Sequence, residues 1–347
     1  MPDLLTGYVN KKVLVTGAAG AVGSNLCTQL ALRGAKVLAV DDLSASERWN
    51  LAQIAGIDFF RADILNEPNM REAFGEKPDV VFHLASFFAN QHSIECPERD
   101  LLVNGMGTLR MLELAREFQI GRFIYASTSA AYRESDDVLT ESESSLRPTS
   151  PYQISKITGE QYCSFFHSYY GLNVVKVRFF NCYGPGEIPG PYRNVIPKFI
   201  YQALKGDPLT ITGTGYETRD FTYVEDIVDG LLRIAFSELL DGEEVNLASG
   251  VETEIVRLAE SINLLTGNRA GITYGRKREW DGHKRRRGSF NRARCSVGYE
   301  PRVFLPEGLE RTLRWFETHW ERIDRIPRLL QGDDDINCFS EGVSRAQ

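Results

Sequence analysis

Three evenly spaced glycines, in the pattern Gly-x-x-Gly-x-x-Gly over residues 17–23, constrain the fold more than any other feature. They directly follow the apolar, β-branched segment 13–15, which is typical of a buried parallel strand. Leucines at helical spacing come next and predict a helix over 24–33, ended by Gly34. Glycines permit a tight turn and let backbone N–H groups approach phosphates, and the helix N-terminus adds positive partial charge. This order predicts a cradle for a dinucleotide pyrophosphate, with an ordinary glycine-rich turn as the alternative.

Acidic residues accompany the next two predicted strands, over 36–40 and 58–64. Asp41 and Asp42 come about 20 residues after the glycines, where the dinucleotide fingerprint places an acid. A carboxylate there accepts from both hydroxyls of the adenosine ribose and repels a 2′-phosphate, so Asp41 favours NAD over NADP; a cap for the next turn is the alternative. Asp63 is placed either to meet the adenine amino group or to cap the following helix.

Strands and helices keep alternating along the first half of the chain. Further strands are predicted over 79–85 and 122–126, with an apolar-faced helix over 98–118 between them. Five such rounds predict a doubly wound parallel sheet, a Rossmann-type α/β fold with right-handed crossovers. His83 is expected to pack at the end of its strand. The hydroxyl residues 127–129 come at the carboxyl end of a strand, where open α/β sheets bind ligands.

A tyrosine and a lysine, Tyr152 and Lys156, lie four residues apart in a helix that Pro151 is expected to begin. This spacing puts both side chains on one helix face. A tyrosine with its ordinary pKa near 10 is a poor base, but a neighbouring ammonium and an oxidised nicotinamide stabilise the phenolate. Such a tyrosine can take a proton from an alcohol as hydride leaves its carbon. Because the pair follows a predicted dinucleotide fold, we interpret it as catalytic; a surface Tyr/Lys pair is the alternative.

Composition argues against several other classes of protein. The chain has 347 residues, 42% of them hydrophobic and 25% charged, and a formal net charge of −7. These values are typical of a soluble globular protein and give no reason to expect nucleic-acid or membrane binding. No segment approaches the roughly 20 apolar residues that span a bilayer, and no signal peptide is apparent. The six cysteines are scattered without metal-ligand spacing, which predicts reduced thiols, no metal site and a cytoplasmic location.

Taken together, the motifs resemble the extended short-chain dehydrogenase/reductase family, in particular its branch of NAD-dependent nucleotide-sugar epimerases and dehydratases, such as UDP-sugar 4-epimerases. The resemblance covers roughly residues 11–325. It is carried by the joint order of motifs at 17–23, 41, 63–64, 83–85, 104, 127–129, 152–156, 178–186, 213–215 and 219–224. It implies NAD as the cofactor, a nucleotide-diphosphate sugar as the substrate, and a homodimer packed through the helices at about 98–118 and 152–170.

The resemblance also implies two lobes. Residues 8–180 with about 215–248 would bind NAD, and residues 181–214 with about 249–328 would form a smaller α+β lobe for the sugar nucleotide. Independently of the resemblance, the polar composition of the end of the chain predicts a flexible tail over 329–347. The NAD contacts that it implies are Gly17, Gly20, Ala21, Val22, Gly23, Asp41, Asp42, Asp63, Ile64, Leu84, Ala85, Asn104, Tyr152 and Lys156. The substrate contacts that it implies are Ser129, Asn181, Asn194, Val195, Arg219 and Arg286.

Two of the implied substrate contacts are arginines. Arg219 matches the arginine that grips the diphosphate, for which a guanidinium fork is well shaped; from the residues alone, a surface salt bridge is equally compatible. Residues 278–281 resemble the family's Arg-x-Gly-Asp stretch, with Trp280 in place of glycine. Arg286, within the basic run 284–287, is the candidate for a second diphosphate contact. Nucleic acid is a poorer match for this run, because no aromatic platform or nucleic-acid motif accompanies it.

In this branch, the residues that follow the active-site threonine distinguish which reaction an enzyme catalyses. Relatives that eliminate water resemble one another in an Asp-Glu pair there, and decarboxylases of uronic acid nucleotides typically keep a Glu in the second place. Here Ser129 and Ala130 follow Thr128, which leaves a site able to oxidise an alcohol and return the hydride. We therefore expect epimerisation at C4: Tyr152 takes the hydroxyl proton, Thr128 binds the same oxygen, and the 4-keto sugar regains hydride on its other face.

Other activities stay open. A 4,6-dehydratase, a uronate decarboxylase or a net NAD-dependent sugar dehydrogenase or reductase would share most of these motifs. A non-catalytic NAD-binding regulator is less compatible, because the catalytic residues are present. Departures from the family pattern leave the sugar and the base undetermined: residues 131–133 replace Val-Tyr-Gly, and Ile211 stands where many relatives place an aromatic residue against the nucleobase. The loop 87–92 is crowded, with His92 either at the substrate or in solvent.

Overall fold

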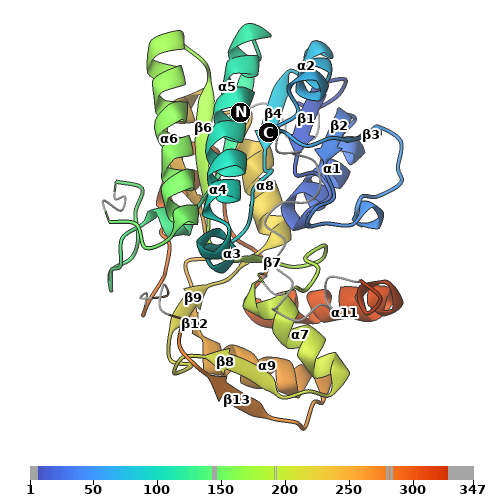
Figure 1. Cartoon of the computed structure of the whole chain (residues 1–347), viewed down its shortest axis with the longest axis vertical. Coiled ribbons are helices and arrows are strands. Elements are labelled where there is room, and N and C mark those ends of the chain that lie inside the picture. The colour runs from blue at the N-terminus through green and yellow to red at the C-terminus, as the bar shows by residue number, and fades with distance from the viewer. Residues whose placement is uncertain are drawn as a thin grey trace, which may run out of the picture.

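The computed structural model describes residues 7–142, 147–190, 192, 194–278, 281 and 284–326. A large layered lobe lies above a smaller lobe in Figure 1. The large lobe is built on a seven-stranded parallel sheet with the strand order β11-β6-β5-β4-β1-β2-β3, which confirms the predicted fold class. Its strands are β1 (Lys12–Thr16), β2 (Lys36–Asp41), β3 (Ile57–Arg61), β4 (Val80–His83), β5 (Arg122–Thr128), β6 (Val174–Phe179) and β11 (Glu244–Leu247).

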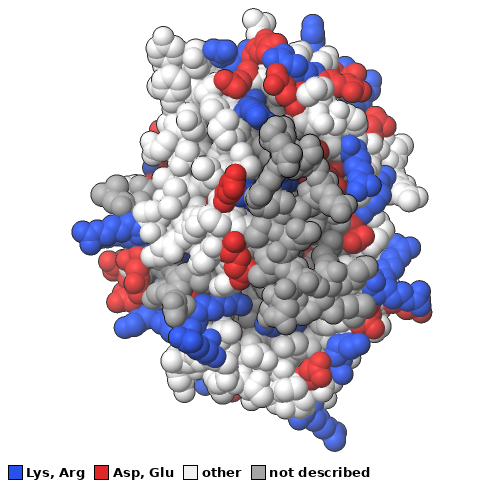
Figure 2. Space-filling model, in the orientation of Figure 1, with Lys and Arg blue, Asp and Glu red and all other residues white. Residues whose placement is uncertain are grey.

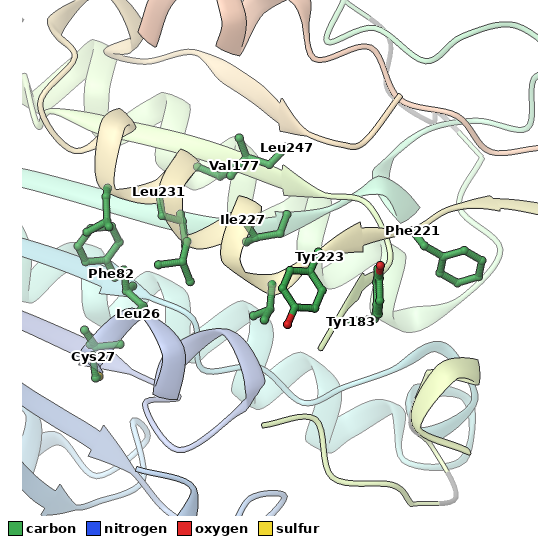
Figure 3. Close-up of a cluster of buried hydrophobic side chains, with 14 of the residues drawn as sticks. Leu26, Cys27, Phe82, Val177, Tyr183, Phe221, Tyr223, Ile227, Leu231 and Leu247 are labelled. Atoms are coloured by element: carbon green, nitrogen blue, oxygen red, sulfur yellow. The ribbon is translucent and has the colours of Figure 1, made fainter. Parts of the chain in front are cut away.

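Helices cover both faces of this sheet, and the pleat of β1 shows why. Val13 and Val15 belong to the same buried cluster as apolar residues of α1 (Ala21–Leu32) and α8 (Val224–Ile234). Figure 3 shows part of this cluster, including Leu26 of α1 and Ile227 of α8. Leu14 points to the opposite face and joins a second cluster with residues of α2 (Glu67–Gly75), α5 (Thr108–Glu117) and α6 (Pro151–Tyr170). A strand buried on both faces needs an unbroken apolar run, which is the pattern found at 13–15.

The smaller lobe consists of short strand pairs and helices from the second half of the chain. β8 (Leu209–Thr212) pairs with β13 (Ile272–Gly275), and β9 (Thr218–Asp220) pairs with β12 (Glu252–Glu254). A further parallel pair, separate from the main sheet, is formed by β7 (Cys182–Tyr183) and β10 (Thr222–Tyr223). The helices of the smaller lobe are α7 (Val195–Lys205), α9 (Ile255–Thr266) and α11 (Leu305–Ile323), which contact one another. The short helix α10 (Asn291–Val297) packs instead against α8 and β11 of the large lobe.

The helix predicted over 98–118 is confirmed as one unbroken helical run, in which α4 (Pro97–Asp100), a π-helical segment Leu101–Gly107 and α5 follow one another. The π-helical middle was not predicted, and a separate short helix, α3 (Asn90–Glu95), precedes the run. Asn104 lies in the π-helical segment and is buried, where its amide binds groups outside that segment. The spacing of apolar residues does not distinguish a π-helical turn from an α-helical one. The helical periodicity of the sequence therefore gave no sign of the π-helical segment.

The expectation that all cysteines are reduced is also wrong. Cys27, Cys163, Cys182 and Cys295 carry free thiols, but Cys96 is disulfide-bonded. The cytoplasmic location, which rested partly on reduced thiols, stays a prediction. Within the described part of the chain, no helix is both long and apolar enough to cross a membrane.

Candidate active site

The predicted glycine turn joins β1 to α1 and faces a cavity of about 610 Å³ lined by both lobes. Gly17 has a φ of 69°, and a Cβ there would lie 2.7 Å from the backbone nitrogen of Ala85. A Cβ at Gly23 would lie 2.2 Å from the Gly17 carbonyl oxygen. Gly20 is the N-cap of α1, and no side chain caps this helix. The turn therefore requires glycine for its close packing, and the first N–H groups of α1 have no side-chain partner at the cap.

Every predicted site residue except Asn104 lines this one cavity. The cofactor group there comprises Gly17, Gly20, Ala21, Val22, Gly23, Asp41, Asp42, Asp63, Ile64, Leu84 and Ala85. The remaining predicted residues on its wall are Thr128, Ser129, Tyr152, Lys156, Asn181, Asn194, Val195, Arg219 and Arg286.

Asp41 ends β2 and binds the glycine turn. Its Oδ1 accepts hydrogen bonds from the Leu43 N–H and the Ser46 hydroxyl, both at 2.8 Å, and its Oδ2 accepts from the Ala19 N–H at 2.9 Å. Burial raises the pKa of Asp41, and these hydrogen bonds oppose that rise. A carboxylate has about four acceptor positions. Asp41 thus holds the turn together and keeps one acceptor position for a ligand in the cavity.

Asp63 does not cap a helix, because the N-cap of α2 is Asn66. The Asp63 carboxylate follows β3, accepts a hydrogen bond from the Leu65 N–H at 2.8 Å, and pairs with Arg99 at 3.1 Å. Of the two possibilities predicted for Asp63, helix capping is therefore wrong, and its place on the cavity wall fits a ligand contact.

Tyr152 and Lys156 face the cavity from the first turns of α6. Tyr152 is 5% exposed and Lys156 is 3% exposed. Burial raises the pKa of Tyr152, the negative charge of Asp100 adds to the rise, and hydrogen bonding to the hydroxyls of Ser86 and Thr128 opposes it. The tyrosine therefore holds its proton until further positive charge reaches the site.

The Lys156 ammonium lies over an aromatic ring, with its Nζ 4.7 Å from the centre of the Tyr125 ring. Burial lowers the pKa of Lys156 to about 8, against the opposing effects of Asp100 and Glu160. Gly159 makes room for this arrangement, since a Cβ there would lie 2.2 Å from the Tyr125 Oη. Lys156 is therefore still mostly protonated at neutral pH.

His83 is packed at the end of β4, as the sequence predicted. Its Nδ1 is 2.8 Å from the Thr16 hydroxyl and its Nε2 is 3.2 Å from the Thr108 hydroxyl. Burial, with a smaller effect from Lys156, lowers the pKa of His83 to about 3. The ring is therefore neutral and held between β1 of the sheet and α5, one of the helices that cover it.

Asn104 acts on the cavity only through other residues. Its Oδ1 accepts hydrogen bonds from the Ser86 hydroxyl and the Phe87 N–H, both at 2.9 Å. Its Nδ2 donates to the Phe87 carbonyl oxygen at 3.0 Å and to Asp100 Oδ1 at 2.8 Å. These four bonds use the whole hydrogen-bonding capacity of the amide. Asn104 holds the loop that carries Ser86 and Phe87, and these two residues line the cavity.

Thr128 and Ser129 lie where β5 ends. The Thr128 Oγ1 accepts a hydrogen bond from the Ala130 N–H at 3.1 Å, which begins the short 3-10 turn Ser129–Ala131. The Thr128 hydroxyl keeps its donor for other partners, Tyr152 among them. The side chains that follow Thr128 are a hydroxyl and a methyl group, so this wall of the cavity carries no carboxylate at 129 or 130.

Two arginines meet on the substrate side of the cavity. The Arg219 guanidinium binds both carboxylate oxygens of Asp281, at 2.8 and 2.9 Å. Arg286 is 8% exposed, and its Nε and Nη2 have no hydrogen-bond partner among the described residues. Burial, followed by the positive charge of Arg219, lowers the pKa of Arg286 to about 9. A buried cation with unused donors on a cavity wall fits an anionic ligand.

Asn181 and Asn194 also reach the cavity, and the amide nitrogen of each is held by a hydrogen bond to another residue. The Asn181 Nδ2 donates to the Asp220 carbonyl oxygen at 3.2 Å. The Asn194 Nδ2 donates to Glu187 Oε1 at 2.7 Å. Both amides keep their oxygens for other partners, which fits contacts with sugar hydroxyls.

The crowded loop 87–92 forms an aromatic wall beside Tyr152. The Phe88 ring meets the Tyr152 ring edge-on at 5.9 Å between centroids. The His92 ring stacks on Tyr192 at 4.1 Å and contacts Phe87 at 3.9 Å. Of the two places predicted for His92, solvent is therefore wrong. Tyr192 was missed, because nothing in the sequence near position 192 indicates that it meets a loop about a hundred residues earlier.

Further aromatic residues that the sequence analysis missed are Phe199 and Phe221, which line the cavity with Ile211. Phe221 lies inside the motif at 219–224, which could have indicated it. Glu279 and Trp280, part of the stretch compared with Arg-x-Gly-Asp, lie outside the described residues, as does the predicted tail from 329. Among the described residues, no cluster of His, Cys, Asp or Glu could hold a metal ion.

Charge on the surface agrees with a small-molecule site. On the face shown in Figure 2, basic and acidic side chains are interspersed over the described surface. In the basic run 284–287, Arg285 pairs with Glu252, while Arg286 is buried at the cavity. The run is thus divided between a surface ion pair and the cavity wall.

A family model described as the NAD dependent epimerase/dehydratase family matches residues 13–248. An epimerase structure from Methanothermobacter thermautotrophicus superposes with a TM-score of 0.92 and is 47% identical, covering 93% of this chain and 97% of that one. A UDP-glucose 4-epimerase from Thermotoga maritima, solved with UDP-glucose, superposes with a TM-score of 0.84 at 32% identity, covering 89% and 99%. A UDP-glucuronic acid decarboxylase from Xenopus tropicalis is 33% identical over 318 residues, 90% of this chain and 73% of the decarboxylase.

Proposed function

The chain belongs to the NAD dependent epimerase/dehydratase family, and from this premise we propose that it epimerises a nucleotide-diphosphate sugar at C4 through a transient 4-keto intermediate. The observation that carries this proposal is the meeting of Thr128, Tyr152 and Lys156 in the same cavity as the glycine turn, with no acid at 129 or 130. Such a site can move a proton and a hydride, but it lacks the acid–base pair that water elimination requires.

The cavity fits NAD as the cofactor. The close-packed turn of Gly17 and Gly23 and the uncapped N-terminus of α1 suit a pyrophosphate, and the free acceptor position of Asp41 suits a ribose hydroxyl. When bound, NAD supplies the hydride acceptor and donor. We propose that residues 8–180 with about 215–248 hold it, and that 181–214 with about 249–328 hold the sugar nucleotide.

Tyr152 is proposed as the base that takes the C4 hydroxyl proton. Its phenol bonds to the hydroxyls of Ser86 and Thr128, and Thr128 is proposed to bind the sugar oxygen that loses the proton. The Lys156 ammonium lies one turn further along α6, and the charge that it keeps at neutral pH favours the phenolate. Tyr152 and Lys156 are both buried, which limits the contact of the phenol and the ammonium with bulk water.

Arg219 and Arg286 are proposed to bind the diphosphate of the substrate. Arg286 has unused donors, and an anion would remove the repulsion between the two guanidiniums. The apolar and aromatic side chains of Phe199, Ile211 and Phe221 are proposed to receive the nucleobase.

We also propose that the active form is a homodimer. Large apolar side chains are exposed on α6 and on the adjoining segment Leu101–Gly107, among them Phe165 at 46%, Tyr169 at 72% and Leu101 at 54% exposure. The surface over α6, at the upper left of Figure 2, carries few charges. A contiguous uncharged patch of this kind suits a self-complementary contact with a second copy of the chain.

The test is to purify the protein, identify its bound dinucleotide, and follow a panel of nucleotide sugars by NMR without added cofactor. An isomer inverted at C4 supports the proposal. A 4-keto-6-deoxy product or released carbon dioxide would instead indicate a dehydratase or a decarboxylase, and stoichiometric NADH would indicate a net dehydrogenase.

A further inference from the structure

A buried carboxylate behind the cavity, Asp100, has no part in the proposed reaction so far. Asp100 is the last residue of α4, is 1% exposed, and does not line the cavity. Its Oδ2 makes no hydrogen bond of good geometry among the described residues, although the Ser155 hydroxyl, which donates to the Tyr152 carbonyl oxygen, is near enough to lower the pKa of Asp100. An acid that is both buried and half-satisfied is costly for a fold, so a specific role for it is expected.

The hydrogen bonds of Asn104 determine the state of the Asp100 carboxyl. The backbone of Phe87 orients the Asn104 amide, because its N–H must donate to Oδ1 and its carbonyl must accept from Nδ2. The remaining Nδ2 proton therefore donates to Asp100 Oδ1, which must act as an acceptor. Burial raises the pKa of Asp100, while the Ser155 hydroxyl, the Asn104 amide and the charge of Lys156 lower it. This arrangement suits an ionised carboxylate.

Asp100 is connected to the reacting phenol through two residues. Its Oδ1 holds the amide of Asn104, the Asn104 Oδ1 accepts from the Ser86 hydroxyl, and Ser86 hydrogen-bonds with Tyr152. Tyr152 and Lys156 on α6 are the titratable groups that face Asp100, and Lys156 in turn faces Glu160 and Cys163 on the same helix and His83 on β4.

We propose that Asp100 is a positioning residue of the active site: its carboxylate fixes the Asn104 amide, and with it the Ser86 hydroxyl at Tyr152, and balances the charge of the Lys156 ammonium. The kinetic part of this inference rests on the proposed epimerase function. The electrostatic part does not, because it concerns the titration of groups in the protein itself.

The substitution Asp100→Asn separates charge from hydrogen bonding, because its amide oxygen can still accept from Asn104. Removal of a negative charge favours the Tyr152 phenolate and disfavours the Lys156 ammonium, so both pKa values fall. We expect the Tyr152 titration to move to lower pH by about 1 unit, the size of effect that a nearby like charge produces. The measurement is the phenolate absorbance of the NAD-loaded protein, taken as the difference from Tyr152→Phe.

The matched control is Asp226→Asn, which neutralises another buried aspartate that accepts from the Arg302 and Val303 N–H groups outside the cavity. We expect no shift of the Tyr152 titration in that variant. If Asp100→Asn does not fold, Asp100→Ser provides a smaller neutral side chain for the same measurement.

An unchanged Tyr152 titration in a folded neutral variant overturns the inference, and an equal shift in Asp226→Asn does so as well. Where the wild-type protein turns over a nucleotide sugar, both limbs of its kcat–pH profile are expected to move to lower pH in Asp100→Asn. A wild-type protein without such turnover contradicts the proposed function alone, because the titration needs no substrate.

Discussion

Tyr152 and Lys156 lie one helical turn apart on α6, and burial moves their pKa values in opposite directions, upward for the phenol and down to about 8 for the ammonium. Each shift follows from the cost of a charge in a poorly solvated site. Without cofactor, Tyr152 is therefore a protonated phenol and the Lys156 ammonium has a lowered pKa. Tyr152 can act as a base only when further positive charge near it favours the phenolate. An oxidised nicotinamide carries such a charge. The ionisation of the Tyr152 phenol therefore depends on the cofactor being in its oxidised state.

The first prediction concerns the proposed base. Tyr152→Phe should reduce turnover by about 10²–10⁴-fold or more, the usual contribution of a positioned acid–base group, while NAD stays bound. The measurements are the rate of sugar isomerisation and the dinucleotide content of the purified protein. Tyr274→Phe on β13, a position 58% exposed and outside the cavity lining, is the matched control and should behave as wild type. Near-normal activity in Tyr152→Phe would rule out the proposed role.

The second prediction is an alkaline loss of activity. Lys156 supports the phenolate only while it is protonated, and its pKa is lowered to about 8, so kcat should fall as the pH rises past this value. The check is a kcat–pH profile at saturating substrate. A kcat that stays constant up to pH 10 would contradict this assignment to Lys156, since pH 10 is about two units above its pKa.

The third prediction gives Arg286 opposite effects on stability and binding. Arg286→Met removes a buried, unpaired charge, so the free protein should melt at a higher temperature. The same change removes charge-assisted hydrogen bonds of about 1.5–3 kcal/mol, so nucleotide-diphosphate affinity should fall roughly ten- to a hundredfold. Thermal melting and calorimetric titration with UDP measure the two effects.

The control for this prediction is Arg285→Met, whose exposed side chain pairs with Glu252 on the surface. It should leave UDP affinity unchanged. A destabilised Arg286→Met with unaltered affinity would mean that Arg286 has a structural partner rather than a ligand.

The fourth prediction concerns the proposed dimer. Phe165→Glu places a charge in the exposed apolar face of α6 and should convert the dimer into a monomer, which sedimentation or light scattering detects. Leu264→Glu, at an 86% exposed position on α9, is the control and should leave the assembly unchanged. A wild-type protein that is monomeric at all concentrations would refute the proposed contact.

Sequence alone determined the parts of the site whose geometry is local. The turn needs glycine at Gly23 because a Cβ there would collide with the turn's own Gly17 carbonyl oxygen. Four-residue spacing on a helix places Tyr152 and Lys156 together whatever surrounds them. Apolar runs and their alternation with helices likewise predicted the parallel sheet, because the pleat and the helical repeat are properties of short segments.

Only the tertiary structure decided the contacts between distant segments. Arg219 meets Asp281, His92 meets Tyr192, and the saturated amide of Asn104 faces Phe87 rather than the cavity. Hydrogen bonding and burial depend on which side chains are brought within about 3 Å of one another, and no periodicity along the chain encodes that. For the same reason the burial of the Asp100 carboxylate could not be predicted from the sequence, because it results from the packing of α4 against α6.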